Sequence, residues 1–189
     1  MKKKLHYLIA IFCLICMHSF SQTTWHVSTT GDDITGDGSE GAPWGTIKGA
    51  IAKEVVWDTH IIQLADGVYT EKEIDVNKGI TIMGTSANGT IVQATADKPD
   101  GEGTDASNDK RVFKIIGGFS VEIKNLTVRN GNVIGQSGAA IYITWNCTAT
   151  IENCNFFDNY SNWNAGAINI EGTGIIKNSK KTGKINNPA

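Results

Sequence analysis

Two stretches of the chain repeat one pattern of apolar and polar residues: Val121-Glu-Ile-Lys-Asn-Leu-Thr-Val128 and Ala149-Thr-Ile-Glu-Asn-Cys-Asn-Phe156. A third stretch, Gly174-Ile-Ile-Lys-Asn-Ser179, keeps the central isoleucine and the asparagine that follows it. Apolar and polar residues alternate before each asparagine, and a period of two is typical of a strand with one buried face. Each stretch is therefore predicted to form a strand that ends near its asparagine.

A second set of short apolar segments precedes these stretches: Val112-Phe-Lys-Ile115, Ala140-Ile-Tyr-Ile143 and Ala167-Ile-Asn-Ile170. Phe113 and Ile141 are 28 residues apart, and Ile141 and Ile168 are 27 residues apart. A repeat of this length indicates a solenoid, in which each unit buries its apolar face by stacking on the next. The segments are too short and too rich in β-branched residues for helices of about 10–12 residues, so helical repeats are excluded.

The three units share an asparagine, at Asn125, Asn153 and Asn178, where an apolar strand must bend. Asparagine tolerates the left-handed backbone that such a bend requires, and identical side chains on stacked units can hydrogen-bond along the stack. We interpret the three residues as a structural asparagine ladder. Asn88, Asn125 and Asn146 also stand in Asn-x-Thr sequences, so N-glycosylation stays an alternative.

One earlier unit carries an insertion. It runs from Ile74 through Ile80-Thr-Ile82 to Ile91-Val92, and Ile82 lies 41 residues before Ile123. This interval is longer than the later ones, and the polar segment 97–110 accounts for the excess. Residues 97–110 are therefore predicted to form a protruding loop.

Residues 46–56 predict an amphipathic helix, because Ile47, Ala50, Ile51 and Val55 recur at helical spacing. A solenoid exposes unpaired strand edges and apolar core at its ends. A terminal helix over residues 46–56 is therefore expected to act as the N-terminal cap.

The first 21 residues have the layout of a secretory signal peptide. Lys2–Lys4 are positively charged, Leu5–Met17 form a short apolar segment, and Ser19-Phe20-Ser21 match a small-x-small cleavage site. The apolar segment is shorter than the ~20 residues of a membrane span, so no stable membrane anchor is expected. Lipid attachment at Cys13 or Cys16 is disfavoured because a large residue precedes each cysteine.

Composition fits one exported globular domain. The chain has 189 residues, 40% hydrophobic and 19% charged, which excludes a disordered linker. Lys and Arg number 17 against 19 Asp and Glu, so the basic footprint of a nucleic-acid-binding protein is lacking and no nucleic-acid partner is expected.

Beyond the signal peptide only two cysteines remain, Cys147 and Cys154. A disulfide between them suits an oxidising compartment, but buried small hydrophobic side chains are the favoured interpretation.

The start of the mature chain resembles a known family. Five segments look like the entry of right-handed parallel β-helix proteins of the pectin-lyase-like superfamily: Trp25-His-Val-Ser-Thr-Thr-Gly-Asp-Asp33, Gly36-Asp-Gly-Ser39, Ala42-Pro-Trp-Gly-Thr-Ile-Lys-Gly-Ala-Ile51, Ile61-Ile-Gln-Leu-Ala-Asp-Gly-Val-Tyr69 and Ile80-Thr-Ile-Met-Gly84. The resemblance extends from about Trp25 to Asn178. It implies an all-β, right-handed parallel β-helix of about three to four coils with an N-terminal α-helical cap. It leaves function open, because the superfamily includes polysaccharide lyases, glycoside hydrolases, adhesins and surface proteins.

We divide the chain into a signal peptide (1–21), an entry strand with the cap helix (22–60), the coils (61–178) and an irregular tail (179–189). The third repeat loses its apolar pattern after Asn178. We therefore expect the chain to be a truncated piece of a longer β-helix protein.

No catalytic set is identified in the sequence. The resemblance to lyases would imply basic residues on the outer face of a central coil, and the coils contain Lys114, Lys124, Arg129 and Lys177. Lys124 and Lys177 precede ladder asparagines and are interpreted as solvated. A hydrolase needs two carboxylates on rigid neighbouring strands. The acidic residues instead concentrate in two loops: Asp32, Asp33, Asp37 and Glu40 in one, and Asp97, Asp100, Glu102, Asp105 and Asp109 in the other.

Neither acidic loop matches the twelve-residue calcium-binding loop. Solvated loops are the favoured interpretation and no cofactor is expected, with calcium as the alternative. His26 and His60 are isolated in the sequence, so no transition-metal site is predicted.

Tryptophans supply the candidate binding residues. Trp44 and Trp57 flank the predicted helix and are expected to pack beneath it. Trp145 and Trp163 fall in turns between strands, where an exposed aromatic ring can stack on a sugar. Trp145 and Trp163 are therefore the candidate substrate-binding residues.

Two functional hypotheses remain. The favoured one is a secreted or cell-surface module that is not catalytic and serves adhesion or binds a polysaccharide or cell-surface glycan. The alternative is the N-terminal fragment of a polysaccharide lyase or glycoside hydrolase that acts on acidic polysaccharide, with its active residues on missing coils.

Overall fold

The computed structural model describes residues 22–97, 110–163, 165–181, 185 and 186. The predicted signal peptide (1–21) and nearly all of the predicted insertion loop (97–110) lie outside these residues. Within the described ranges, no helix is long and apolar enough to cross a membrane.

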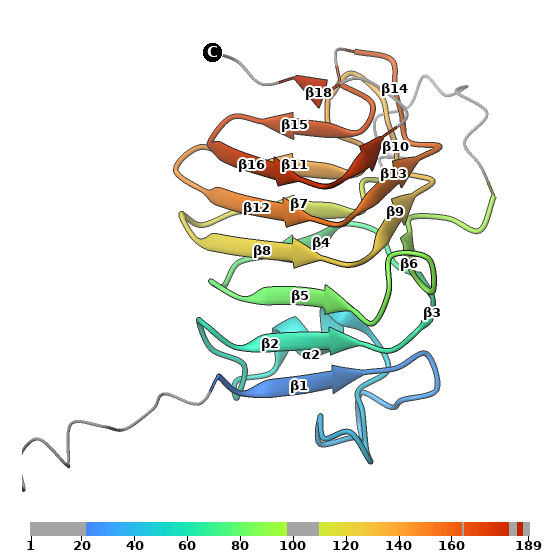
Figure 1. The fold of residues 1–189 in the computed structure, drawn as a ribbon, viewed down its shortest axis with the longest axis vertical. Helices are drawn as coiled ribbons and strands as arrows, with labels where there is room; N and C mark the ends of the chain where they lie inside the picture. The colour runs from blue at the N-terminus through green and yellow to red at the C-terminus, as the bar shows by residue number, and fades with distance from the viewer. Residues whose placement is uncertain (1–21, 98–109, 164, 182–184, 187–189) are drawn as a thin grey trace, which may run out of the picture.

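Three sheets of parallel strands make up most of the described chain (Figure 1). Sheet I has the order β1 (Thr24–Val27), β2 (Ile61–Leu64), β5 (Thr81–Gly84), β8 (Ser120–Lys124), β12 (Thr148–Glu152) and β16 (Thr173–Lys177). Sheet II has the order β3 (Gly67–Thr70), β6 (Thr90–Gln93), β9 (Thr127–Arg129), β13 (Asn155–Phe157) and β17 (Lys180–Lys181). Sheet III has the order β4 (Ile74–Val76), β7 (Phe113–Ile115), β11 (Ile141–Ile143), β15 (Ile168–Ile170) and β18 (Ile185–Asn186). A fourth, short parallel pair joins β10 (Asn132–Val133) and β14 (Tyr160–Ser161).

Successive strands enter the three sheets in turn. After β8 in sheet I, the chain forms β9 in sheet II and β11 in sheet III, and it returns to sheet I as β12. The fold is therefore all-β with parallel sheets, which is consistent with the predicted solenoid. Each long sheet has five or six strands, more than the three to four predicted coils. The first set, β2 to β4, lies within the predicted coil region 61–178, although the repeat identified in the sequence begins only at Ile74. The last set includes β17 and β18, within the tail predicted to be irregular.

The strand register confirms the alignment of the repeats. Ile151 pairs with Ile123 on one side and with Ile176 on the other. In sheet III, Ile141 lies between Phe113 and Ile168 in the same way. Equivalent residues of successive units thus lie side by side in the sheets.

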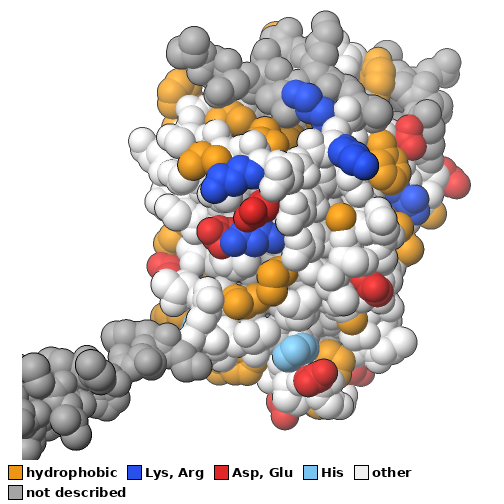
Figure 2. Space-filling view, viewed as in Figure 1, with side chains coloured by type: hydrophobic (Ala, Val, Ile, Leu, Met, Phe, Trp, Pro, Cys, Tyr) orange, Lys and Arg blue, Asp and Glu red, His pale blue; other side chains and the backbone are white. Residues whose placement is uncertain are grey.

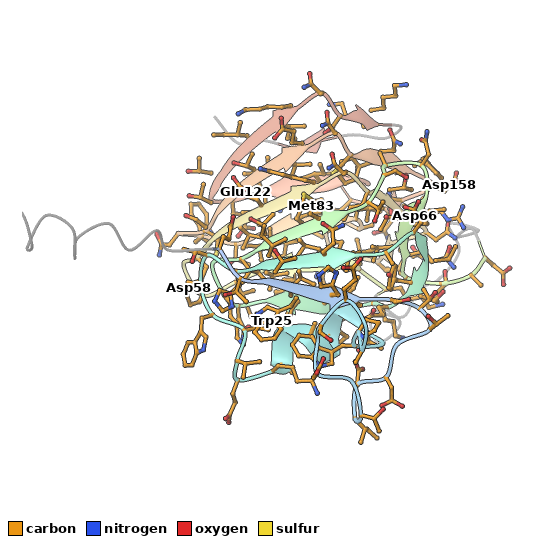
Figure 3. All side chains as sticks on the ribbon, turned by 60° about the horizontal axis from the view of Figure 1, so that its bottom comes forward. Trp25, Asp58, Asp66, Met83, Glu122 and Asp158 are labelled. Atoms are coloured by element: carbon orange, nitrogen blue, oxygen red, sulfur yellow. The ribbon has the colours of Figure 1, made fainter. Side chains whose placement is uncertain are left out.

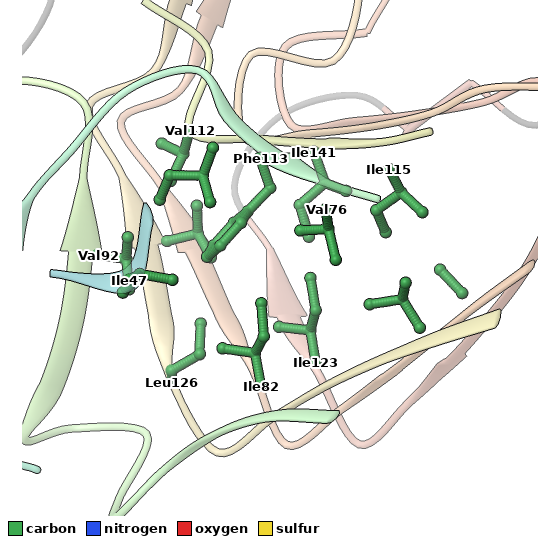
Figure 4. Close-up of a cluster of buried hydrophobic side chains, with 14 of the residues drawn as sticks. Ile47, Val76, Ile82, Val92, Val112, Phe113, Ile115, Ile123, Leu126 and Ile141 are labelled. Atoms are coloured by element: carbon green, nitrogen blue, oxygen red, sulfur yellow. The ribbon is translucent and has the colours of Figure 1, made fainter. Parts of the chain in front are cut away.

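The core lies between the three sheets and is built from these register rows (Figure 4). Ile82 and Ile123 of sheet I, Val92 of sheet II, and Phe113 and Ile141 of sheet III are fully buried in one cluster. Because burial of one such side chain contributes about 1.5–3 kcal/mol, repeated rows of isoleucine and valine are the main stabilising element.

The predicted turn role of the asparagines is confirmed. Asn125, Asn153 and Asn178 all have positive φ, at 54°, 53° and 47°. The side-chain amide of Asn153 donates to Oδ1 of Asn125 at 3.3 Å. No equivalent bond from Asn153 to Asn178 is found among the described residues, so the ladder has one side-chain link in this part of the chain.

Helix α2 (Ile47–Ala52) lies within the predicted span 46–56 but is shorter. Thr46 caps its first turn, because the Thr46 hydroxyl accepts from the amide of Gly49 at 2.9 Å. Asp33 accepts from the amide of Thr46, and Glu71 accepts from the first two amide groups of the helix at 2.8 and 3.0 Å. The backbone becomes extended at Lys53, which ends the helix.

The two tryptophans expected beneath this helix behave differently. Trp44 is buried in the core together with Ile47 and Ile51 of α2. Trp57 is 67% exposed, so its predicted packing is wrong. The helix stops at Ala52, and the loop that follows places Trp57 outside the core.

Candidate functional site

The two candidate tryptophans are both exposed, Trp145 at 70% and Trp163 at 63%. Trp145 follows the carboxyl end of β11, whereas Trp163 precedes the amino end of β15. Because β11 and β15 are parallel neighbours in register, the two tryptophans lie at opposite ends of sheet III. The structure therefore does not bring them into one site.

Trp163 lines a pocket of about 250 Å³ on the outer side of sheet III, here called the Trp163 pocket. Tyr142 of β11 and Asn169 of β15 are paired in register and face outward, because the isoleucines beside them are buried. The residues that line the pocket are Arg111, Gly135, Gln136, Ser137, Tyr142, Trp163, Asn169 and Glu171. An exposed aromatic ring thus stands beside several side chains that bind hydroxyl groups.

Arg111 fixes the shape of this pocket. Its side chain is 3% exposed and donates from Nε to the carbonyl of Gly138 at 3.0 Å and from Nη2 to Gln136 Oε1 at 2.9 Å. Nη2 also donates to the carbonyl of Ser137 at 3.2 Å, and the guanidinium lies over the Tyr142 ring at 5.0 Å. Arg111 therefore holds the loop that contains Gln136 and Gly138 against β11.

Sequence reasoning did not identify Arg111. Arginine is rarely fully buried, so its position before the buried segment Val112–Ile115 was the only available signal. Among the described residues, no carboxylate lies within ion-pair distance of its guanidinium.

Tyr142 is held in its neutral form. Burial, together with a hydrogen bond to the Glu171 carboxylate and its negative charge, raises the pKa of Tyr142 to about 12. Arg111 opposes this increase only weakly. Tyr142 therefore presents a neutral hydroxyl group to the Trp163 pocket, which Glu171 also lines.

The basic residues considered for lyase chemistry are spread over all three sheets. Lys124 of sheet I forms ion pairs with Glu122 at 2.8 Å and Glu152 at 3.9 Å, and Lys177 is exposed, so both match the predicted solvated role. Arg129 of sheet II donates to Gln93. Only Lys114 of sheet III is near the Trp163 pocket, as the register neighbour of Tyr142.

The N-terminal acidic loop bonds mainly to its own backbone. Asp32 accepts from the amides of Ile34 and Thr35, and these bonds lower the pKa of its carboxyl. Hydrogen bonds from Ser39 lower the pKa of Asp37 in the same way. These carboxylates therefore stabilise turns. The acidic residues of the insertion lie outside the described residues, except Asp97.

The described residues contain no group of three His, Cys, Asp or Glu arranged to hold a metal ion. His60 accepts from the Trp25 indole at 3.0 Å, so it has a structural partner. Cys147 and Cys154 are buried and not joined by a disulfide. Burial raises the pKa of the Cys154 thiol to about 11, which suits the predicted role as a small hydrophobic side chain.

Comparison of the chain with protein-family models, with curated proteins and with solved structures found no match. The functional interpretation therefore depends on the geometry of the chain itself.

Proposed function

We propose that the chain is a secreted or cell-surface module with the right-handed parallel β-helix fold of the pectin-lyase-like superfamily, exported by the signal peptide 1–21. Three parallel sheets filled in turn by successive strands support the solenoid, as do the left-handed asparagines between sheets I and II. The buried face of α2 supports its role as the N-terminal cap, because Ile47, Ala50 and Ile51 belong to the same core cluster as the first strands.

The module binds a polysaccharide or cell-surface glycan through the Trp163 pocket. The observation that carries this proposal is the 63% exposed Trp163 ring beside a preformed polar pocket. The flat face of an exposed tryptophan ring fits the apolar face of a sugar ring, and Trp163 presents such a face beside a polar pocket. Asn169 and Glu171 supply groups that bond to hydroxyls, and Arg111 keeps the pocket open.

The outer row of sheet III extends this surface along the stack. Asp75, Lys114, Tyr142 and Asn169 are consecutive register partners on β4, β7, β11 and β15. Neighbouring strands are about 4.8 Å apart, so the row covers roughly 14 Å. A row of polar side chains of this length suits a polymer better than a single sugar.

The module is not itself catalytic. Glu171 is the only carboxylate among the residues that line the Trp163 pocket, whereas glycoside hydrolysis uses two. Glu73, which precedes β4, accepts from the backbone amide of Arg111 at 3.0 Å and so has a structural role. Within the part of the chain that the structure describes, no feature favours the alternative, an N-terminal fragment of a polysaccharide lyase or hydrolase.

A glycan array followed by calorimetric titration tests the proposal. Wild type is expected to bind at least one glycan, and Trp163→Ala is expected to weaken that binding by about tenfold or more, as loss of a central aromatic anchor does. Trp145→Ala is the matched control, because it removes an equally exposed ring at the other end of sheet III. Release of unsaturated uronate or of reducing sugar by the pure protein would contradict the non-catalytic role.

A further inference from the structure

A second, larger groove of about 680 Å³ lies on the outer face of sheet I and shares no lining residue with the Trp163 pocket. Its floor is a register row, in which His26 of β1 pairs with Gln63 of β2 and Gln63 pairs with Met83 of β5. These side chains face outward because their strand neighbours, such as Val27, Ile62 and Ile82, are buried. Met83 and the outer side of sheet I can be followed in Figure 3.

The loop between β1 and α2 forms the wall of the groove, through Glu40 and Pro43. Backbone hydrogen bonds hold this loop against the free edge of β1. The amide of His26 donates to Gly38 at 2.8 Å, and the amide of Trp44 donates to the carbonyl of His26 at 3.0 Å. The buried Trp44 ring anchors the loop from below, so the groove is preformed.

Polar groups in the groove are available to a ligand. Within the described residues, the side chains of His26 and Glu40 have no hydrogen bond or ion pair with another group. Ser28, Thr85 and Asn125 also line the groove, but their side chains already bond to Thr30, to the carbonyl of Leu64 and to Asn153. These polar groups surround the apolar surfaces of Met83 and Pro43.

The charge of the groove selects against anions. No Lys or Arg lines it, and Glu40 is its only acidic side chain. In Figure 2, the Lys and Arg side chains gather over the upper part of this face, whereas the lower part shows Asp, Glu and His among uncharged side chains. Beside the groove, Lys124 is the register partner of Met83, but its ammonium group forms ion pairs with Glu122 and Glu152. An anionic ligand would therefore meet no unpaired Lys or Arg in the groove.

A peptide is also disfavoured. Extended peptides bind to sheets mainly by adding a strand to a free edge. The loop of residues 36–44 already occupies the outer edge of β1 through its backbone hydrogen bonds. What remains is a ligand that presents hydroxyl groups and small apolar faces but no negative charge.

We propose that this groove, here called the sheet I groove, binds a short segment of uncharged oligosaccharide that lies across β1, β2 and β5. Hydroxyl groups of the sugar bond to His26, Glu40 and Gln63, and its apolar face lies on Met83. The groove reaches from β1 to Asn125 after β8, three strand spacings of about 4.8 Å, which is enough for several sugar units. This site is independent of the proposed glycan binding at Trp163.

The test is an NMR titration of the ¹⁵N-labelled protein with maltotetraose, cellotetraose, xylotetraose and mannotetraose, and with tetragalacturonate as the anionic comparison. At least one neutral tetramer is expected to shift the backbone amides of His26, Gln63 and Met83, and tetragalacturonate is expected to leave them unchanged. Met83→Arg fills the groove and should weaken that binding by about tenfold or more. Val68→Arg, which adds the same side chain at a 45% exposed position on sheet II, is the matched control.

Two further variants make the result independent of any folding defect. Glu40→Gln and His26→Ala change side chains without protein partners, so both proteins should fold and bind the tetramer several-fold more weakly. Trp163→Ala should leave the sheet I shifts unchanged, which separates this site from the Trp163 pocket. The proposal is overturned if none of the four neutral tetramers shifts these amides. It is also overturned if tetragalacturonate binds there equally well, or if Met83→Arg and Val68→Arg bind alike.

Discussion

Asn153 donates a side-chain hydrogen bond to Asn125 at 3.3 Å, and both residues have the left-handed backbone, with φ of 53° and 54°. The same pair therefore performs two tasks: each residue lets the chain bend from sheet I into sheet II, and together they join two successive units. Substitutions at Asn153 can separate these tasks.

Asn153→Gly keeps the bend and loses the side-chain bond, so it should lower the free energy of unfolding by about 0.5–1.5 kcal/mol. Asn153→Ala loses the bond and also forces a Cβ-bearing residue without a polar side chain to adopt positive φ, which costs roughly 1–2 kcal/mol more. Urea denaturation measures both variants. An alanine variant as stable as the glycine variant would show that the bend does not depend on asparagine.

Ile151 and Ile176 occupy the same register row but differ in burial, at 0% and 36% exposed. Ile151→Ala should destabilise the protein by about 2–5 kcal/mol, because it leaves a cavity in a closed core. Ile176→Ala should cost less than half as much, because its side chain keeps contact with water in the folded state. If thermal or chemical denaturation shows that both variants lose the same free energy of unfolding, the difference in burial between the two isoleucines is contradicted.

Arg111→Met should destabilise the protein by about 2–4 kcal/mol, because it removes three hydrogen bonds from a buried guanidinium and leaves the carbonyl groups of Ser137 and Gly138 without these donors. Arg129→Met is the matched control. Arg129 is half-buried and donates to Gln93 from Nε, so its loss should cost about 1.5 kcal/mol or less. If both variants lose a similar free energy of unfolding, Arg111 does not hold the loop that contains Gln136 and Gly138.

Glu71 should make stability depend on pH in an unusual direction. Burial raises the pKa of its carboxyl above the usual value, and the two amide donors of α2 oppose this increase only in part. Protonation is therefore favoured in the folded state. The stability of wild type relative to Glu71→Gln should be greatest at low pH and should fall as the pH rises through the raised pKa.

The exposed Asp37 should change stability with pH in the opposite direction. Hydrogen bonds from Ser39 lower its pKa, so the stability of wild type relative to Asp37→Asn is present at neutral pH and is lost as the pH falls through the lowered pKa. Chemical denaturation from acidic to neutral pH measures both differences. A difference for Glu71→Gln that does not change with pH would contradict the burial of its carboxyl.

The local pattern of the sequence was enough to predict the strands of the repeated units, their register and the asparagine turns, but not β17 and β18. Ile123, Ile151 and Phe113 could be assigned because a repeat places equivalent residues side by side, so local alternation and long-range pairing agree. The segment Ile61–Tyr69 was assigned to the coils from its resemblance to a family rather than from the repeat, because Leu64 is followed by Ala65 and Asp66 and not by an asparagine. Trp57 was misplaced because helical spacing continues to Val55 although the helix ends at Ala52.

The two candidate sites were less predictable because they depend on contacts between distant segments. Exposure of Trp163 followed from its place in a turn, but the pocket beside it requires Arg111, which bonds to a loop 25–27 residues away. The sheet I groove depends on the loop of residues 28–43, which folds back along β1 through backbone hydrogen bonds. Such bonds produce no repeating pattern of residues in the sequence. Side-chain chemistry could be read from the sequence, but the placement of the loops could not.

The most direct test of the central claim is to follow the indole N–H signals of the tryptophans by NMR while adding the glycan selected on the array. Trp163 and Trp57 are similarly exposed, but only Trp163 lines the proposed binding pocket. The account predicts a saturable shift of the Trp163 indole signal and no shift of the Trp57 signal. A bound glycan that leaves the Trp163 signal unchanged would contradict it.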